Sequence, residues 1–250
     1  MLIRSRLIPV LLLDRRRRLV KTVQFGERTY IGDPFNVVRL FNEKEVDEIF
    51  ILDIDATVDA REPDLEFIAK LASECFMPLA YGGGITSLAH CRELNRCGVE
   101  KFVLGTGALN PELLRAISRD FGTQALAACI DVRTAGVTRC VVRSGTADTG
   151  RDPLAFAHEL QDAGVGEIVV QSVDRDGLRT GCDLELTRQL SAALTVPIVT
   201  LGGAGCVDDL VKALAAGASA AASGSAFCFL GRLRAVLVTY PSYEPQSTAV

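Results

Sequence analysis

The sequence predicts an α/β fold: a single (β/α)8 barrel, or TIM barrel, spanning residues 1–250. Short apolar runs alternate with amphipathic runs along the whole chain, with short connections between them. This pattern is typical of parallel strands joined by crossover helices. Eight such units can be counted, which is the number that closes a parallel sheet into a barrel, and a length of 250 residues fits one barrel.

The expected strands are short and apolar because helices cover the outer face of such a sheet. In chain order they are Arg6–Leu13, Glu48–Asp53, Pro78–Tyr81, Lys101–Leu104, Ala125–Asp131, Glu167–Gln171, Pro197–Leu201 and Ala218–Ala222. Apolar residues at helical spacing predict helices between them. These include Asp64–Glu74, Leu88–Cys97, Pro153–Ala163, Asp183–Ala193 and Asp208–Ala216. A further helix should start near Pro34, because Asp33 can cap it and proline suits its first turn.

The two halves of the chain repeat each other. Gly82-Gly83-Gly84 corresponds to Gly202-Gly203-Ala204-Gly205, and the segment Val103–Gly107 corresponds to Ala222–Ser225. A repeat of half the chain length predicts a duplicated unit, with half-barrels of about residues 1–123 and 124–240. The tail, residues 241–250, is expected to be flexible.

Composition excludes several classes of partner. The net charge of −4 gives no general attraction to nucleic acid or anionic membranes, and the apolar runs are too short to span a bilayer. The eight cysteines form no CxxC pair and no ligand spacing with the only two histidines, His90 and His158. We therefore expect reduced thiols, no metal, no cofactor and a cytoplasmic location.

Glycine-rich segments at two rims predict phosphate binding. Small residues after a strand let backbone N–H groups approach a phosphate at a helix N-terminus, and the loops after strands seven and eight are the usual site in such barrels. The residues concerned are Gly203, Ala204, Gly205, Gly224 and Ser225, with a second, weaker site at Gly83, Gly84 and Thr106. The alternative is that both clusters are only tight turns. Two clusters half a chain apart favour a phosphorylated small molecule as ligand.

Acidic residues at strand ends are candidates for acid–base chemistry at the barrel mouth. Asp131 ends the fifth strand and Asp176 follows the sixth, whereas Asp53 and Asp174 are expected to be structural. Leu12 stands where the matching strand of the first half would carry a second carboxylate. In the first loop we expect the arginines 15–18 to form a solvated turn.

Lys21 differs from those arginines. The apolar pair before it, Leu19-Val20, suggests an ordered segment that leads back to the mouth, where the lysine could hold an anionic substrate.

The segments RLIPVLLL, YIGDP, YGGGI, SVDRDG and VTLGGAG, in this order, resemble the cyclase subunit of imidazole glycerol phosphate synthase. The resemblance runs from Arg6 to about Phe229. It implies a phosphate-binding barrel that takes ammonia from a glutaminase subunit at its N-terminal face and delivers it to a two-phosphate substrate at the other mouth. It also implies catalytic roles for Asp131, Asp176 and Lys21. An ammonia gate is implied at Arg6, Glu48, Lys101 and Glu167.

The chain departs from this family at four polar positions. The first catalytic aspartate falls on Leu12, and an asparagine, a threonine and a serine fall on Gly105, Gln171 and Leu201. IDATVDAREP and the ending RAVLVTYPSYE resemble a paralogous branch, which works with a glutaminase and a sugar amidotransferase in acetamidino modification of surface-polysaccharide sugars. That function is what the resemblance implies. The alternatives are an authentic cyclase of histidine biosynthesis, with Asp14 as substitute acid, and a non-catalytic structural conduit.

Overall fold

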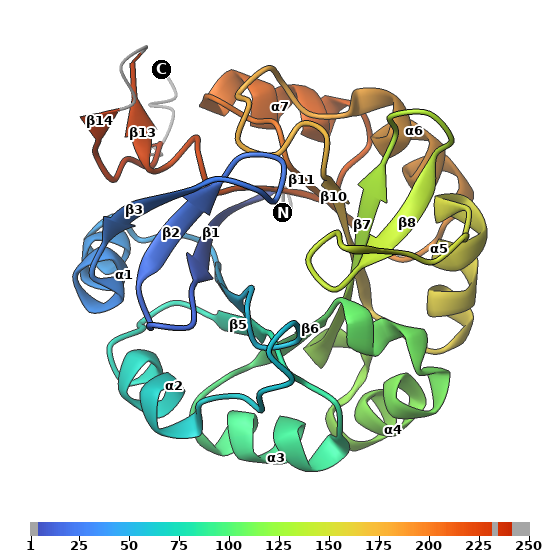
Figure 1. The fold of residues 1–250 in the computed structure, drawn as a ribbon, viewed down its shortest axis with the longest axis horizontal. Helices are drawn as coiled ribbons and strands as arrows, with labels where there is room; N and C mark the ends of the chain where they lie inside the picture. The colour runs from blue at the N-terminus through green and yellow to red at the C-terminus, as the bar shows by residue number, and fades with distance from the viewer. Residues whose placement is uncertain (1–4, 232–234, 242–250) are drawn as a thin grey trace, which may run out of the picture.

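Eight parallel strands close into a barrel in the computed structural model, which describes residues 5–231 and 235–241 (Figure 1). Neighbours in the chain pair in order, and the last strand pairs back with the first, with Arg6 opposite Ala220. The barrel strands are β1 (Arg6–Leu13), β4 (Ile49–Asp53), β5 (Leu79–Gly82), β6 (Lys101–Leu104), β7 (Leu126–Arg133), β10 (Glu167–Ser172), β11 (Ile198–Leu201) and β12 (Ala220–Ser223). The predicted fold class is confirmed.

Helices surround the barrel on its outer face (Figure 1). They are α1 (Pro34–Glu43), α2 (Leu65–Ala72), α3 (Leu88–Arg96), α4 (Pro111–Phe121), α5 (Pro153–Asp162), α6 (Leu184–Ala193) and α7 (Val207–Ala215). Side-chain caps mark the starts of all of these helices except α7: Asp33, for example, accepts a 3.0 Å hydrogen bond from the Asn36 N–H at the start of α1. The prediction of a capped helix there is confirmed. Two short 3-10 helices, η1 (Thr106–Leu109) and η2 (Thr123–Ala125), flank α4.

Two antiparallel hairpins extend the barrel strands. The first, β2 (Leu19–Thr22) and β3 (Arg28–Gly32), pairs with β1, so the ordered segment expected before Lys21 is confirmed. The second, β8 (Arg139–Val142) and β9 (Ala147–Asp148), pairs with β7 and was not predicted.

The eighth unit differs from the expected strand and helix. Within the described residues no helix follows β12. A two-stranded antiparallel sheet stands there instead, made of β13 (Phe229–Leu230) and β14 (Ala235–Val236). The tail expected to be flexible lies outside the described residues beyond Pro241.

The barrel encloses its own apolar core, separate from the larger core between sheet and helices. Side chains alternate along each strand, so every second residue points inward. The inner core includes Ile8, Val10, Phe50, Ala80, Val103, Ala127, Val169, Val199, Ala220 and Ala222. These side chains separate the two ends of the barrel. In the part of the chain described, no helix is long and apolar enough to cross a membrane.

Candidate functional site at the barrel mouth

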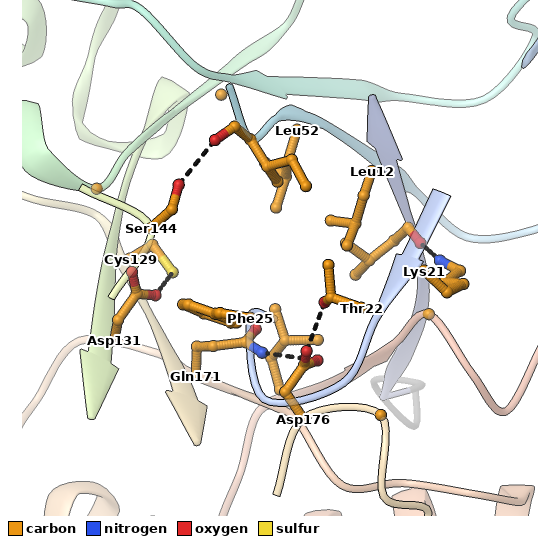
Figure 2. A pocket seen from close by; sticks show the side chains of 18 of the residues that line it. Leu12, Lys21, Thr22, Phe25, Leu52, Cys129, Asp131, Ser144, Gln171 and Asp176 are labelled. Carbon is orange, nitrogen blue, oxygen red and sulfur yellow. Dashed lines mark hydrogen bonds between the residues drawn. The ribbon is translucent and has the colours of Figure 1, made fainter. Parts of the chain in front are cut away.

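A cavity opens at the C-terminal ends of the barrel strands, hereafter the mouth (Figure 2). Its lining brings together most of the predicted site residues: Lys21, Gly83, Thr106, Asp131, Asp176, Gly203, Ala204, Gly224 and Ser225. Gly84 and Gly205 are not in that lining. The N–H of Gly205 donates a 2.9 Å hydrogen bond to the Asp209 carboxylate, and so is not free for a ligand.

Asp131 is the mouth residue best suited to proton transfer. Burial raises the pKa of its carboxyl from 3.8 to about 7, and the nearby Asp176 adds to the shift, while the Cys129 thiol opposes it. The Cys129 Sγ lies 3.5 Å from Asp131 Oδ1. A carboxyl that titrates near neutral pH can either donate or accept a proton there.

Asp176 is held in place by neighbours on both sides. It accepts hydrogen bonds of 2.6 Å from the Thr22 hydroxyl and 3.3 Å from the Gln171 amide (Figure 2). Burial raises the pKa of Asp176, although these bonds and the charge of Lys21 act in the opposite direction. Gln171, at a position where the family resemblance implies a threonine, therefore supports Asp176.

Lys21 reaches the rim of the mouth, but its amine turns toward the β1 backbone (Figure 2). Its Nζ donates a hydrogen bond to the Val10 carbonyl and lies against Gly224. The side chain is only 6 % exposed. Burial lowers the pKa of Lys21, whereas the Cys228 thiol and the Asp176 carboxylate raise it.

Leu12 lies across the mouth from Asp131 (Figure 2). It pairs with Leu52 in register, and with Leu201 these side chains form part of the apolar inner core. The floor of the mouth is therefore apolar on the side where a second carboxylate would be needed for a pair.

Asp14, the candidate substitute acid, lies outside the mouth. It lines a separate small cavity beside α2 rather than the mouth. The Arg18 side chain holds its carboxylate through bonds of 2.9 and 2.7 Å. Burial alone would raise the pKa of Asp14, but the bonds from Arg18 and Arg16 lower it below its usual value.

The β8–β9 hairpin folds over one side of the mouth. At its turn the Ser144 hydroxyl donates a 2.7 Å hydrogen bond to the Ile54 carbonyl, and the Arg143 N–H donates one of 3.0 Å to the Thr106 hydroxyl. A Cβ on Gly145 would lie 3.1 Å from the ring of Phe25, which comes from the β2–β3 hairpin. The two hairpins thus meet above the cavity.

Sequence reasoning missed this hairpin. The signal was present as a turn containing Gly145, set between the short runs that form β8 and β9.

The loops after β11 and β12 offer donors for an anion. Among the described residues, the N–H groups of Gly203, Gly224 and Ser225 donate to no protein acceptor. The neighbouring Ser223 hydroxyl accepts from the Ala226 N–H at 3.0 Å, which fixes this turn. Free N–H groups converging on a cavity can bind a phosphate.

The opposite end of the barrel carries a charged ring of Arg6, Glu48, Lys101 and Glu167. Each is at or next to the first residue of a barrel strand. Lys101 Nζ lies 2.6 Å from Glu48 and 2.9 Å from Glu167, and Arg6 also pairs with both glutamates. The glutamates are buried, and the ring lies directly against the inner core, with Lys101 Nζ 5.9 Å from the centre of the Phe50 ring.

Two acids expected to be structural have that role. Asp53 accepts from the N–H groups of Asp55 and Ala56 and pairs with Arg61 at 3.1 Å. Asp174 accepts from the Thr134 and Ala135 N–H groups. Both carboxylates therefore stabilise loops at the rim.

Comparisons with known proteins agree with this architecture. The family model described as "Histidine biosynthesis protein" matches residues 6–233. The chain is 46 % identical over 244 residues to the "Putative imidazole glycerol phosphate synthase subunit hisF2" of Pseudomonas aeruginosa, covering 96 % of this chain and 97 % of the relative. It is 39 % identical over 225 residues to the "Imidazole glycerol phosphate synthase subunit HisF" of Exiguobacterium sibiricum, covering 89 % and 90 %. The chain therefore belongs to the histidine biosynthesis protein family and is a HisF-like member of it.

Proposed function

We propose that this chain is the barrel subunit of a glutamine amidotransferase system. A glutaminase subunit docks at the N-terminal face, and its ammonia passes the charged ring and the apolar inner core to reach the mouth. Three features support this: the relatives are named as synthase subunits, Arg6 and Lys101 each pair with both ring glutamates, and the interior beyond them is apolar. Uncharged ammonia crosses such an interior at lower cost than ammonium.

Leu12 lies opposite Asp131, and this observation carries the proposal beyond family membership. Cyclisation by an acid–base pair needs two titratable groups, and losing one typically costs about 10² to 10⁴ in rate. Asp14, the substitute expected for an authentic cyclase, is bonded to Arg18 away from the mouth. In this proposal the ammonia therefore serves another acceptor than the substrate of histidine biosynthesis.

The acceptor we favour is a sugar amidotransferase that converts an N-acetyl group to an acetamidino group in surface-polysaccharide synthesis in the cytoplasm. The resemblance to that paralogous branch supports it, as do the changes at Gly105, Gln171 and Leu201, which alter the mouth. A purely structural conduit is less favoured, because Gly203, Gly224 and Ser225 present free N–H groups to the cavity.

A channelling experiment tests the proposal. The chain is combined with the glutaminase and the sugar amidotransferase from the same host, with ¹⁵N-amide glutamine and unlabelled ammonium. Label should enter the amidino product in preference to bulk ammonium. Lys101→Met should reduce labelling, while Lys70→Met, on exposed α2, should not. Equal incorporation from both nitrogen sources, or unchanged labelling in Lys101→Met, would contradict the proposal.

A further inference from the structure

Phe76 is the most exposed large apolar residue of the described chain, with 85 % of its surface in contact with solvent. It lies in the loop between α2 and β5 (Figure 1). Loops that lead from a helix into a strand lie at the N-terminal end of the barrel. Within the described residues, Phe76 is the only large apolar residue exposed on any of these loops. Leaving a phenyl group in water forgoes the free energy that its burial would give.

The loop presents this phenyl group on an ordered backbone. The Phe76 N–H donates a 3.0 Å hydrogen bond to the Asn42 side chain, whose amide donates one of 2.6 Å to the Glu74 carbonyl. Arg39 holds the Glu74 carboxylate through bonds of 2.9 and 3.0 Å. The next residue, Met77, is buried. The position of Phe76 is therefore fixed before a partner binds, which lowers the entropic cost of binding.

The fold does not require a side chain at this place. Gly98, Gly164 and Gly217 hold the corresponding place in three other loops, each one residue before a buried apolar residue, as Phe76 is before Met77. A loop of this kind therefore closes without a side chain there. Packing within the barrel does not account for the phenyl group.

Phe76 lies at the same end of the barrel as the charged ring. Two residues further on, the Pro78 carbonyl accepts a 3.0 Å hydrogen bond from the N–H of Ile49, which directly follows Glu48 of the charged ring. A subunit that covers the charged ring to deliver ammonia would therefore reach Phe76 as well. Aromatic side chains are enriched in protein interfaces, where a few buried anchors carry most of the affinity.

We propose that Phe76 anchors the glutaminase subunit by inserting into an apolar pocket on the glutaminase surface. Phe76 is a binding residue in this proposal and takes no part in the passage of ammonia, which is left to the charged ring. The inference rests on the proposed function and deepens it by naming the residue that holds the partner.

Calorimetric titration of the full chain with the glutaminase subunit from the same host tests the assignment. Phe76→Ala should weaken binding about 30-fold or more, the loss typical of a central anchor. Phe76→Met, which keeps a long apolar side chain, should retain most of the affinity. The matched control is Val137→Ala, because Val137 is 66 % exposed in the turn between β7 and β8, at the opposite end of the barrel. It should leave binding unchanged.

Two further readouts separate an apolar anchor from a charged contact or a structural role. The loss of affinity in Phe76→Ala should be the same at low and at high sodium chloride concentration, because apolar contacts are not screened by salt. The heat-capacity change of binding should become less negative, since less apolar surface is buried. Without partner, Phe76→Ala should melt at the same temperature as the unmodified chain, because the side chain it removes is exposed.

Three results would overturn the assignment: unchanged affinity in Phe76→Ala, an equal loss in Val137→Ala, or a lower melting temperature of Phe76→Ala in the absence of partner. Sedimentation of the chain alone adds a fourth, because self-association that Phe76→Ala abolishes would make a second copy the partner. Failure of the proposed function looks different: the unmodified chain itself would then bind no glutaminase. If the unmodified chain binds and Phe76→Ala binds equally well, only the role of Phe76 is wrong.

Discussion

The Arg143 backbone N–H donates a 3.0 Å hydrogen bond to the hydroxyl of Thr106 and ties the β8–β9 hairpin to the loop after β6. That contact makes the two rims of the mouth unequal. The hairpin therefore engages the hydroxyl of Thr106, whereas N–H groups that donate to no protein acceptor among the described residues occur on both rims, at Gly83 and Gly105 as well as at Gly203 and Gly224.

Unequal rims predict unequal effects on inorganic phosphate binding. Gly203 has φ of +93° and contacts the Gly181 carbonyl where a Cβ would stand, so Gly203→Ala should displace this loop and weaken binding at least about tenfold. Thr106→Val, similar in shape, should change it less than about twofold. The rise in melting temperature with added phosphate measures phosphate binding by both variants. A greater loss of binding in Thr106→Val than in Gly203→Ala would place the anion at the Thr106 rim and contradict the prediction.

The raised pKa of Asp131 predicts a pH dependence of stability. The pKa of Asp131 is about 7 in the folded chain, compared with the ordinary value of 3.8 expected in the unfolded chain. Between these two pH values the folded chain therefore binds a proton at Asp131 that the unfolded chain does not. Stability must therefore fall as pH rises through this window. The mouth is open to solvent, so we expect a loss of roughly 1–2 kcal/mol, less than the full shift would give.

Asp131→Asn isolates that dependence, because it cannot ionise. Urea unfolding at pH 5 and pH 8.5 should show a smaller decrease in the free energy of unfolding for this variant than for the unmodified chain. Identical decreases in the two proteins would mean that Asp131 titrates at its ordinary pKa.

The charged ring predicts energetic coupling between its members. Lys101→Met leaves two buried glutamates sharing Arg6, while Glu167→Gln relieves that excess of negative charge. A double-mutant cycle on these two positions should give a coupling free energy of about 1–3 kcal/mol by chemical denaturation. The same cycle on Lys70 and Glu66, an exposed pair on α2, should give no measurable coupling. Equal couplings would show that the ring charges are screened.

The sequence predicted the barrel well because each strand is a local apolar run bounded by turn residues. The predicted bounds of Arg6–Leu13 and Lys101–Leu104 match β1 and β6. Strand ends elsewhere differ by one or two residues: Pro78 and Pro197 lie just before β5 and β11, and Gly82 extends β5 beyond its predicted end. At the level of whole elements the sequence missed the β8–β9 hairpin, and after β12 the described residues form β13 and β14 in place of a helix.

The site was predictable as a set of residues but not as a set of contacts. Strand position brought Asp131 and Asp176 to one cavity, as expected for carboxyl ends of parallel strands. Three contacts could not be predicted from local sequence. Lys21 donates to the Val10 carbonyl, the Gly205 N–H donates to Asp209, and the Arg143 N–H donates to the Thr106 hydroxyl. Those contacts join residues from different loops, and only the closed barrel brings them together.

Restoring the missing acid should recover little activity. Leu12→Asp would place a carboxylate beside Leu52 and opposite Asp131, but Gly105, Gln171 and Leu201 also differ from the family pattern. A substrate held in a different orientation loses the alignment on which the rate depends. We expect less than about tenfold recovery in the cyclase reaction with supplied ammonium. Recovery to the rate of an authentic cyclase would show that Leu12 alone accounts for the difference.

The most direct test of the central claim is cyclase turnover by the unmodified chain. The purified chain is given saturating ammonium at alkaline pH and the two-phosphate substrate of imidazole glycerol phosphate synthase, and the reaction is followed by absorbance beside an authentic cyclase. With Leu12 facing Asp131, we predict a rate at least about 10²-fold below that of the authentic enzyme. Near-normal turnover would contradict the account and show that this chain cyclises its substrate with another acid.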